Sequence, residues 1–301
     1  MSNMTDSALD STPDIGVRIR SLLPSLAPAE RRVAERVLAD PTAAAASTIS
    51  ALAENCETSE TTVIRFCRAV GFTGYPALRL ALAAEGGRSA AGHSRDFTGD
   101  IVADDDLDEV VAKIAFADAR AVQDTARQLD LDELHAVIDA FVAAPRIDVY
   151  GVGASGMVAQ DLQQKLHRIG RVAFAWVDPH MALTSAALLT PGDVAVAISH
   201  SGATQDTLDA LEIARRSGAT TVAVTNFPRS PLATLGDHVL TTAARETTFR
   251  SGATASRLAQ LTVVDCVFVG VAQRTFDTTQ RALELTHDAV ADRRVGRKTG
   301  R

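Results

Sequence analysis

The second half of the chain alternates short, β-branched apolar runs with segments of helical periodicity. The apolar runs lie at residues 147–150, 172–177, 194–198, 221–225 and 239–242. Strands that are apolar on both faces and separated by helices are typical of a parallel sheet covered on both sides. We therefore predict an α/β domain with a doubly wound parallel sheet. Helical patterns at 107–128 and 132–143 precede the sheet, and patterns at 256–274 and 277–292 follow it.

A second, all-helical domain is predicted before the sheet. The chain has 301 residues, 46% of them hydrophobic, which is enough for two cores. Between the two regions the composition shifts from Gly86-Gly87 to an acidic run that includes Asp104 and Glu109. We expect an α-helical domain at 15–88, a linker at 89–106, the α/β domain at 107–292 and a basic tail at 293–301.

Several classes of protein and site are disfavoured by composition. The first 14 residues are polar and acidic, and the longest apolar stretch, 261–272, is interrupted by Asp265. We therefore expect a cytoplasmic protein with no membrane partner. Cys56, Cys67 and Cys266 lack the spacing of a metal site, so reduced thiols and no metal or cofactor are expected. The net charge of −7 argues against a wholly basic nucleic-acid coat.

Two short helices are predicted around residues 48–70. Thr48 is suited to cap the first, a polar break at 55–58 ends it, and Ser59 is suited to cap the second. The second helix has one apolar stripe, formed by Val63, Phe66, Cys67 and Val70. The other faces are expected to carry Glu60, Thr61, Thr62, Arg65 and Arg68. A short helix, a tight turn and a helix with a polar outer face are typical of a helix-turn-helix that binds DNA.

The polar side chains of the second helix suit contacts with operator DNA. Arg65 is placed to pair with a guanine edge, and Thr61 and Thr62 can hydrogen-bond bases or phosphates. Arg68 and the later Arg79 are better suited to phosphates. Ser59, at the start of the helix, completes the candidate set. The alternative is an ordinary pair of helices in an all-α domain.

Two loops at predicted strand ends suit a phosphate group. The segment 151–156 reads Gly-Val-Gly-Ala-Ser-Gly, and the segment 199–204 reads Ser-His-Ser-Gly-Ala-Thr; each lies between a strand and a helix. Hydroxyl groups and free backbone N–H groups at helix N-termini bind phosphate monoesters. The candidate ligand-binding residues in these loops are Gly153, Ser155, Ser199, Ser201, Gly202 and Thr204.

Other interpretations of these loops remain open. The first loop also satisfies G-x-G-x-x-G, and Asp178 at the end of the next strand would then bind the ribose of a dinucleotide. The serines and threonine are also favoured helix caps. Glu246 is suited to bind sugar hydroxyls or to pair with a nearby arginine, and His180 and His200 are possible acid–base groups.

Taken together, these segments resemble the RpiR/MurR family of bacterial transcriptional regulators, which join a helix-turn-helix to a sugar isomerase (SIS) domain of flavodoxin-like fold. The resemblance rests on 48–53, 59–72 and Gly74-Tyr75, and on 151–155, 198–204 and Glu246 with Arg257 downstream. The turn Cys56-Glu57-Thr58 departs from the small, glycine-containing turn of the family.

The resemblance implies that Ser155, Ser199, Ser201 and Thr204 hold a phosphosugar effector, and that the protein is a homodimer or homotetramer that regulates sugar-metabolism genes. Repression that the effector relieves by releasing operator DNA is the commoner behaviour in the family, and tighter DNA binding with the effector is the alternative. No catalytic residue is then expected. The alternative is a phosphosugar isomerase or lyase of the SIS type with an accessory helical domain. Such an enzyme requires a positioned base, for which Glu246, His200 and His180 are the candidates.

Overall fold

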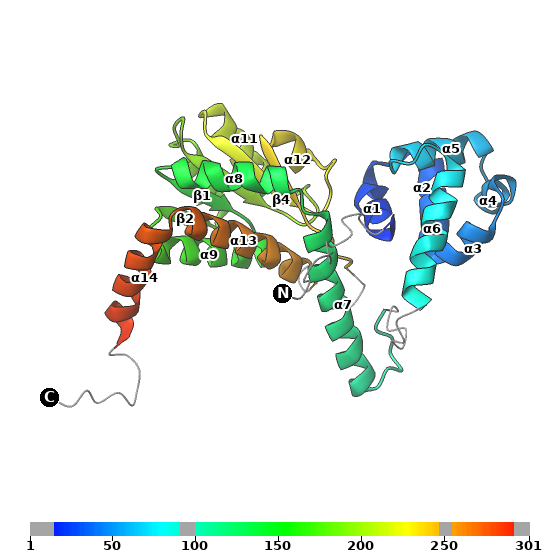
Figure 1. Ribbon diagram of the computed structural model, residues 1–301. Coiled ribbons are helices and arrows are strands. Elements are labelled where there is room, and N and C mark those ends of the chain that lie inside the picture. Colours follow the sequence, from blue (N-terminus) through cyan, green and yellow to red (C-terminus); the bar gives the residue numbers. More distant parts are fainter. Residues whose placement is uncertain (1–14, 91–99, 247–254, 292–301) are drawn as a thin grey trace, which may run out of the picture.

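The computed structural model of this chain describes residues 15–90, 100–246 and 255–291. Figure 1 shows a helical N-terminal domain beside a larger α/β domain. The predicted order of a helical domain followed by a parallel-sheet domain is therefore confirmed. The predicted basic tail at 293–301 and residues 91–99 of the predicted linker lie outside the described residues.

The N-terminal domain consists of short helices around one apolar core. Its elements are α1 (Ile15–Leu22), the 3-10 helix η1 (Leu23–Ser25), α2 (Pro28–Ala39), α3 (Pro41–Ala46), α4 (Ile49–Asn55), α5 (Glu60–Ala69) and α6 (Tyr75–Ala90). The hydroxyl oxygens of Thr48 and Ser59 accept hydrogen bonds from the first turns of α4 and α5, as predicted. The predicted stripe of α5 is fully buried in the core.

Two places in this domain show how proline and glycine affect helix boundaries. Pro41 ends α2 but also begins α3, because a proline fits the first turn of a helix and Asp40 caps that turn. Helix α6 continues through Gly86-Gly87 to Ala90, so the shift in composition at these glycines does not end the helix. A glycine lowers helix stability by only about 1 kcal/mol relative to alanine, and the preceding helix is long enough to tolerate it.

The α/β domain is built on a five-stranded parallel sheet. Its elements are α7 (Leu107–Gln128), α8 (Leu131–Ala143), β1 (Ile147–Tyr150), α9 (Gly153–Arg168), β2 (Ala173–Trp176), α10 (Pro179–Ala186), β3 (Val194–Ile198), α11 (Gln205–Arg216), β4 (Thr220–Thr225), α12 (Pro231–Leu235), β5 (His238–Thr241), α13 (Ala255–Arg274) and α14 (Phe276–Ala291). The strand order is β2-β1-β3-β4-β5, and each pair is parallel. All five predicted strands are present, and each end lies within one residue of its predicted position.

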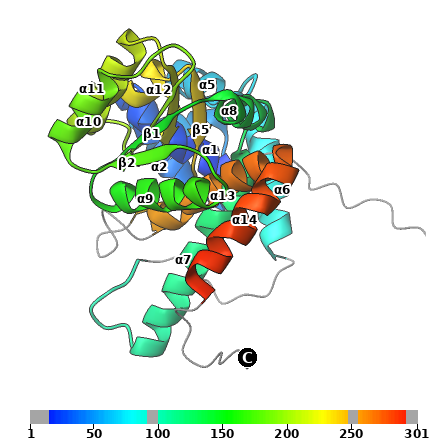
Figure 2. The ribbon, with the colours of Figure 1, turned by 90° about the vertical axis from the view of Figure 1, so that its left-hand side faces the viewer.

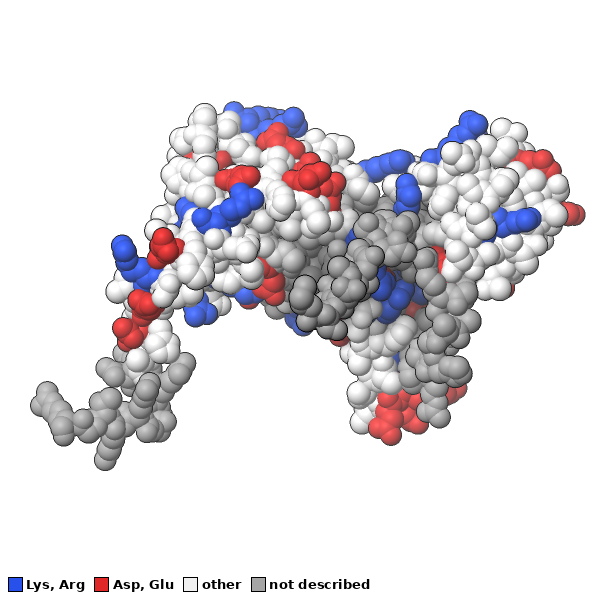
Figure 3. Space-filling model, in the orientation of Figure 1, with Lys and Arg blue, Asp and Glu red and all other residues white. Residues whose placement is uncertain are grey.

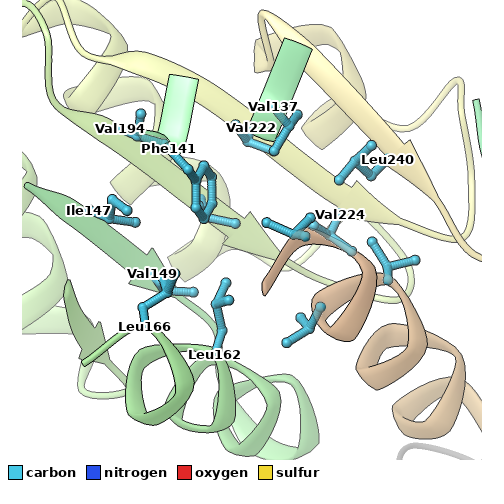
Figure 4. Close-up of a cluster of buried hydrophobic side chains, with 14 of the residues drawn as sticks. Val137, Phe141, Ile147, Val149, Leu162, Leu166, Val194, Val222, Val224 and Leu240 are labelled. Atoms are coloured by element: carbon cyan, nitrogen blue, oxygen red, sulfur yellow. The ribbon is translucent and has the colours of Figure 1, made fainter. Parts of the chain in front are cut away.

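The two faces of the sheet bury side chains of different size. On one face, valines and isoleucines pack against α8, α9 and α13, and Figure 4 shows Val149, Phe141 and Leu162 within that core. On the other face, Ala195, Ala197 and Ala223 lie under α10, α11 and α12. Because side chains alternate along a strand, each strand supplies large residues to one layer and small residues to the other.

Helix α13 is a central part of this core. Among the described residues it is the one helix long and apolar enough to cross a membrane by length and composition. The helix is nevertheless part of the core, where four of its valines are buried in one cluster with side chains of the sheet: Val263, Val264, Val267 and Val271. Its Asp265 forms an ion pair with Lys165 of α9, as expected for a polar residue at a helix interface.

The core packing predicts a large contrast between two phenylalanines. Phe141 is 1% exposed, whereas Phe276 is 65% exposed. We expect Phe141→Ala to lower the free energy of unfolding by about 3–5 kcal/mol, because it leaves a cavity in the core. The matched change Phe276→Ala should lower it by less than about 1 kcal/mol. Urea unfolding followed by circular dichroism compares the two, and equal losses would contradict this assignment of the core.

Candidate functional site

The candidate ligand site lies where the chain reverses its direction across the sheet. From β1 the chain moves outward to β2, and then returns to β3 on the other side of β1 before continuing to β4 and β5. The loops after β1 and β3 therefore leave neighbouring strands in opposite directions and open a crevice between them, which is where ligands bind in open α/β sheets. Helices α9 and α11 both begin at this crevice. The N-terminus of a helix attracts anions.

The loop between β3 and α11 is held together by its own hydroxyl groups. The Ser199 and Thr204 hydroxyl oxygens lie 3.0 Å apart, and the Gly202 N–H donates to Ser199 Oγ at 3.2 Å. The Ala203 N–H donates to Ser201 Oγ at 3.2 Å. Ser199 is buried, whereas Ser201 is exposed. The structure thus brings Ser199, Ser201 and Thr204 together in one tight loop, as the sequence predicts.

A second loop supports this one from below. Gly202 has a φ of +62°, and a Cβ added there would lie 2.1 Å from Ser230 Oγ and 2.7 Å from Thr225 Oγ1. The Leu232 N–H donates to the Gly202 carbonyl at 2.9 Å, and the Asn226 N–H donates to the His200 carbonyl at 3.1 Å. The phosphate-loop candidate therefore rests directly on the β4–α12 loop, with room for glycine only at position 202.

The loop between β1 and α9 contributes Gly153 and Ser155. Gly153 has a φ of +59° and open space where a Cβ would project. Ser155, in the first turn of α9, lies 3.2–3.3 Å from the side-chain amide of Gln260 on α13. This contact joins the first loop to the helix that covers the same edge of the sheet.

Glu246 follows β5 by five residues and is also drawn toward α13. Its carboxylate accepts a hydrogen bond from the Ser256 hydroxyl. Burial lowers the pKa of His200 below its usual value, and the nearby Glu246 carboxylate opposes part of that shift. Within the described part of the chain, the buried Nδ1 atom of His200 has no hydrogen-bond partner. The His200 ring packs against Phe227, with the ring centroids 5.6 Å apart.

Gln260 and Ser256 are site residues that the sequence analysis missed. Both are buried, with exposed fractions of 1% and 3%, and both lie in an otherwise apolar helix. A buried polar side chain in an apolar helix indicates a specific partner, which here is Ser155 or Glu246. A polar residue within an apolar helix is visible in the sequence at both Ser256 and Gln260. The helical periodicity alone, however, does not show which residues of α13 face the strand ends.

Asp178 and His180 both lie at the start of α10. The Asp178 carboxylate accepts a hydrogen bond from the Met181 N–H at 2.9 Å and caps α10. His180, in the first turn of α10, is exposed. In the described ranges, no group of three His, Cys, Asp or Glu side chains is placed to hold a metal ion.

A small cavity lies between the ligand loop and the N-terminal domain. It has a volume of about 200 Å³ and is lined by Ser201, Arg229 and Ser230 on one side and by Ser21 and Pro24 on the other. Figure 1 shows α1 as the part of the N-terminal domain next to the α/β domain. The outer edge of the ligand loop therefore borders the α1–η1 corner.

Most of the candidate DNA-contacting residues are exposed, and one is buried. Thr61, Arg65 and Arg68 are exposed at spacings of four and three residues, so they share one face of α5. Arg79 is exposed on α6. In contrast, Thr62 is buried, and its hydroxyl lies 3.0 Å from Ser59 Oγ. The expectation that Thr62 lies on an outer face is therefore wrong, because its side chain points into the helix cap.

The turn between α4 and α5 explains how a sequence without glycine still makes a tight corner. Glu57 has a φ of +48°, a conformation that glycine adopts more easily. The Glu57 and Thr58 N–H groups donate to the carbonyls of Glu54 and Ala53, which is the Schellman arrangement. Arg32 of α2 donates to the Cys56 carbonyl at 3.0 Å and to the Glu57 carbonyl at 2.9 Å. This arginine fixes the turn from outside.

Acidic groups orient the exposed face of α5. Glu60 accepts a hydrogen bond from Ser50 Oγ of α4 at 2.5 Å, so its carboxylate links the two helices. Arg65 lies 3.6 Å from Glu30 of α2, and its side chain is 60% exposed. In the view of Figure 3, basic side chains are spread over the N-terminal domain on a mostly uncharged surface. The contact Arg65–Glu30 holds the guanidinium near the helix face without covering it.

Comparisons with known proteins agree with both halves of the chain. Residues 15–89 match the model of the helix-turn-helix domain of the rpiR family, and residues 140–270 match that of the SIS domain. An uncharacterized HTH-type transcriptional regulator of Caldanaerobacter subterraneus is 39% identical, over 94% of this chain and 99% of its own. The HTH-type transcriptional regulator RpiR of Escherichia coli is 30% identical, over 93% and 94%.

Two solved structures extend the comparison. The Vibrio vulnificus NanR protein complexed with ManNAc-6P matches 94% of this chain and 100% of its own, with 30% identity and a TM-score of 0.59. The sugar isomerase domain of an RpiR transcription factor from Sphaerobacter thermophilus matches 60% of this chain and 99% of its own, with 26% identity and a TM-score of 0.55.

The support under the ligand loop predicts a difference between two glycines with positive φ. Alanine at either Gly202 or Gly192 incurs backbone strain of about 1–2 kcal/mol. Only at Gly202 does the new Cβ also collide with Ser230 and Thr225, since Gly192 has open space. We expect Gly202→Ala to lower the melting temperature clearly more than Gly192→Ala in differential scanning calorimetry. A larger effect at Gly192 would contradict the described loop geometry.

Proposed function

The chain is a transcriptional regulator of the RpiR family, and we propose that a phosphosugar bound at the reversal of its sheet controls its binding to operator DNA. The observation that carries the proposal is the meeting of two hydroxyl-bearing loops and two helix N-termini at one crevice. That combination supplies both the hydrogen-bond donors and the positive electrostatic field that a phosphate monoester needs. The family resemblance alone would not identify the atoms involved.

In the proposed complex, the phosphate is held by the Ser155, Ser199, Ser201 and Thr204 hydroxyls. The backbone N–H groups of Gly153 and Gly202 complete the phosphate site. At present Ser199 and Thr204 hydrogen-bond to each other, and a phosphate oxygen would replace that contact. Glu246 is placed to accept hydrogen bonds from sugar hydroxyls. The ligand in the related NanR structure, ManNAc-6P, supports this chemical class.

We propose that Thr61, Arg65 and Arg68 face operator DNA, with Arg79 contacting phosphates outside the groove. Ser59 acts through the start of α5, whose N-terminus would enter the major groove. A homodimer or homotetramer would present two such helices to paired half-sites. This is the expected arrangement of a cytoplasmic repressor of sugar-metabolism genes.

The cavity beside Ser201 supports a route between the two sites. A ligand that draws Ser201 toward the crevice changes the surface that faces Ser21 and Pro24 of the N-terminal domain. Coupling requires only that ligand and DNA favour different domain arrangements. In this proposal the phosphosugar favours an arrangement that fits the operator poorly, and so releases the protein.

We further propose that the bound sugar phosphate is an effector and is not turned over. Glu246, the candidate base, is already hydrogen-bonded to Ser256. His200 is mostly enclosed, and the exposed His180 belongs to a helix on the outer part of the sheet. SIS domains also occur in isomerases, so a coupled assay of aldose–ketose interconversion tests this role directly.

The ligand site predicts a selective thermal shift. We expect one class among a panel of hexosamine, N-acetylated, muramic, pentose and ketodeoxy-acid phosphates to raise the melting temperature. A ligand at 100 times its Kd adds about 2.7 kcal/mol to the stability of the native state. The double change Ser199→Ala and Ser201→Ala should remove the shift while leaving DNA affinity intact.

The control for this experiment is Ser217→Ala, a serine at the far end of α11, which should leave the shift unchanged. A shift that persists in the Ser199/Ser201 variant would move the phosphate to another site. Conversion of the bound phosphosugar to its ketose or aldose isomer in a coupled assay would contradict the effector role.

The exposed face of α5 predicts how two arginines differ. Arg65→Ala should weaken operator binding by about 1–3 kcal/mol and relax the preference for one base pair. Arg68→Ala should weaken binding to all sequences alike and reduce its salt dependence by about one charge. Arg216→Ala, which removes an exposed charge on α11, is the control. Fluorescence anisotropy with operator and scrambled duplexes distinguishes these effects, and unchanged specificity in Arg65→Ala would remove this residue from base recognition.

A further inference from the structure

Helix α13 carries two polar side chains in a row of buried apolar ones. Ser256 and Gln260 lie four residues apart, so they share one face of the helix, and Val264 and Val267 continue that face into the core. Figures 1 and 2 show α13 beside α9 on one side of the sheet. A buried polar group is unfavourable unless it is hydrogen-bonded, so both polar side chains require specific partners at these positions.

Small residues fix the rotation of α13 about its own axis. Ala255 and Ala259 are buried in one cluster with Ala121 of α7. Gln260 follows Ala259 directly and lies on the neighbouring face of the helix. The packing of the alanines against α7 therefore turns the Gln260 side chain toward the first turn of α9, where it meets Ser155.

Both polar atoms of the Gln260 amide are directed at one hydroxyl group. Gln260 Nε2 lies 3.2 Å from Ser155 Oγ and can donate to it, and Gln260 Oε1 lies 3.3 Å from the same oxygen and can accept from it. Gln260 is 1% exposed, so water does not compete for these atoms. The single hydroxyl proton then has two arrangements: Ser155 donates to the amide oxygen, or it accepts from the amide N–H and directs its proton elsewhere.

A phosphate group distinguishes between these two arrangements. The oxygens of a phosphate dianion accept hydrogen bonds and do not donate them, so Ser155 binds them only by donating its proton. In the occupied site the Gln260 amide N–H donates to Ser155 Oγ, and the hydroxyl proton points to the phosphate. In the empty site Ser155 can donate to Gln260 Oε1. The amide therefore satisfies the hydroxyl in both states.

We propose that Gln260 is a positioning residue of the ligand site, which orients the Ser155 hydroxyl as a hydrogen-bond donor toward the phosphate of the effector. In this arrangement Gln260 contacts Ser155 and not the phosphate. The inference rests on the phosphate site of the proposed function and deepens it by naming the group that favours a ligand with acceptors only. A carboxylate at this position would have the opposite effect, because it accepts the Ser155 proton and donates none in return.

Gln260→Glu tests the direction of the hydrogen bond, because glutamate has the shape of glutamine without its N–H donors. At about pH 8 we expect the variant to bind phosphate at least about tenfold more weakly than wild type, since the carboxylate accepts the Ser155 proton and repels the anion. As the pH falls, the carboxyl group becomes protonated and regains a donor, so the affinity of the variant should approach that of wild type. A role in packing alone would give a difference that does not change with pH.

The probe is inorganic phosphate, titrated against chloride at constant ionic strength, and the apparent Kd is taken from the rise in melting temperature. The Ser199→Ala, Ser201→Ala variant defines the rise that does not come from the site. The ionisable side chains of His200 and Glu246 are present in both proteins, so each comparison with wild type is made at the same pH. Gln273→Glu, at an exposed position about 20 Å further along α13, adds the same charge to the same helix and should leave the apparent Kd unchanged.

Gln260→Met tests the same role without a buried charge. Methionine is similar in length but has no N–H donor, so this variant should bind phosphate about fivefold more weakly at every pH. In a Ser155→Ala background the change to methionine should have no further effect, because the hydroxyl that it would release is absent. This double-mutant cycle remains decisive if the Gln260→Glu protein does not fold.

The outcomes separate this inference from the proposed function. Phosphate that stabilises wild type no more than the Ser199/Ser201 variant would contradict the phosphate site itself. If wild type binds phosphate but the Gln260→Glu difference is the same at every pH, the positioning role is overturned and the phosphate site stands. The same conclusion holds if the loss in Gln260→Met persists in full in the Ser155→Ala background.

Discussion

The ligand site depends on a change in strand order: β2 is added on one side of β1, and β3 on the other. Because the chain leaves β1 toward one edge of the sheet and leaves β3 toward the other, no connecting helix covers the space between the two strand ends. Two short loops are left facing each other there, each followed at once by a helix N-terminus. Every other part of the site is arranged around this crevice: the β4–α12 loop supports it from below, and α13 closes it from the side.

Much of this arrangement can be predicted from sequence, and the exceptions have physical reasons. The strands were predictable because they are apolar on both faces: β3 has Val194 and Val196 on one face and Ala195 and Ala197 on the other. The loop hydroxyls were predictable because they directly follow strands. Gln260 was not, because its role depends on which side of α13 meets the strand ends. Thr62 was misassigned because a residue in the first turn of a helix can point back into the cap, which periodicity does not distinguish from an outward position.

In the N-terminal domain, the turn between α4 and α5 keeps its tight geometry although its sequence departs from the family pattern. The expected turn glycine is absent, and Glu57 adopts the left-handed conformation in its place. Arg32 compensates by binding the two carbonyls of the turn from a neighbouring helix. A sequence pattern records only the missing glycine, whereas the arginine that replaces its effect lies 25 residues earlier in the chain. The angle between α4 and α5 is thus maintained by a contact between helices.

The alanine layer of the sheet has a consequence for how such a sensor can change over time. Ala195, Ala197 and Ala223 set the distance at which α11 lies above the strands, and the N-terminus of α11 forms one wall of the crevice. A larger side chain in this layer would lift the helix and widen the opening without altering a single ligand-binding group. Sensitivity to the effector can therefore be adjusted by core substitutions that leave the recognition chemistry intact, so that two relatives with identical loops need not respond to the same concentration of the same molecule.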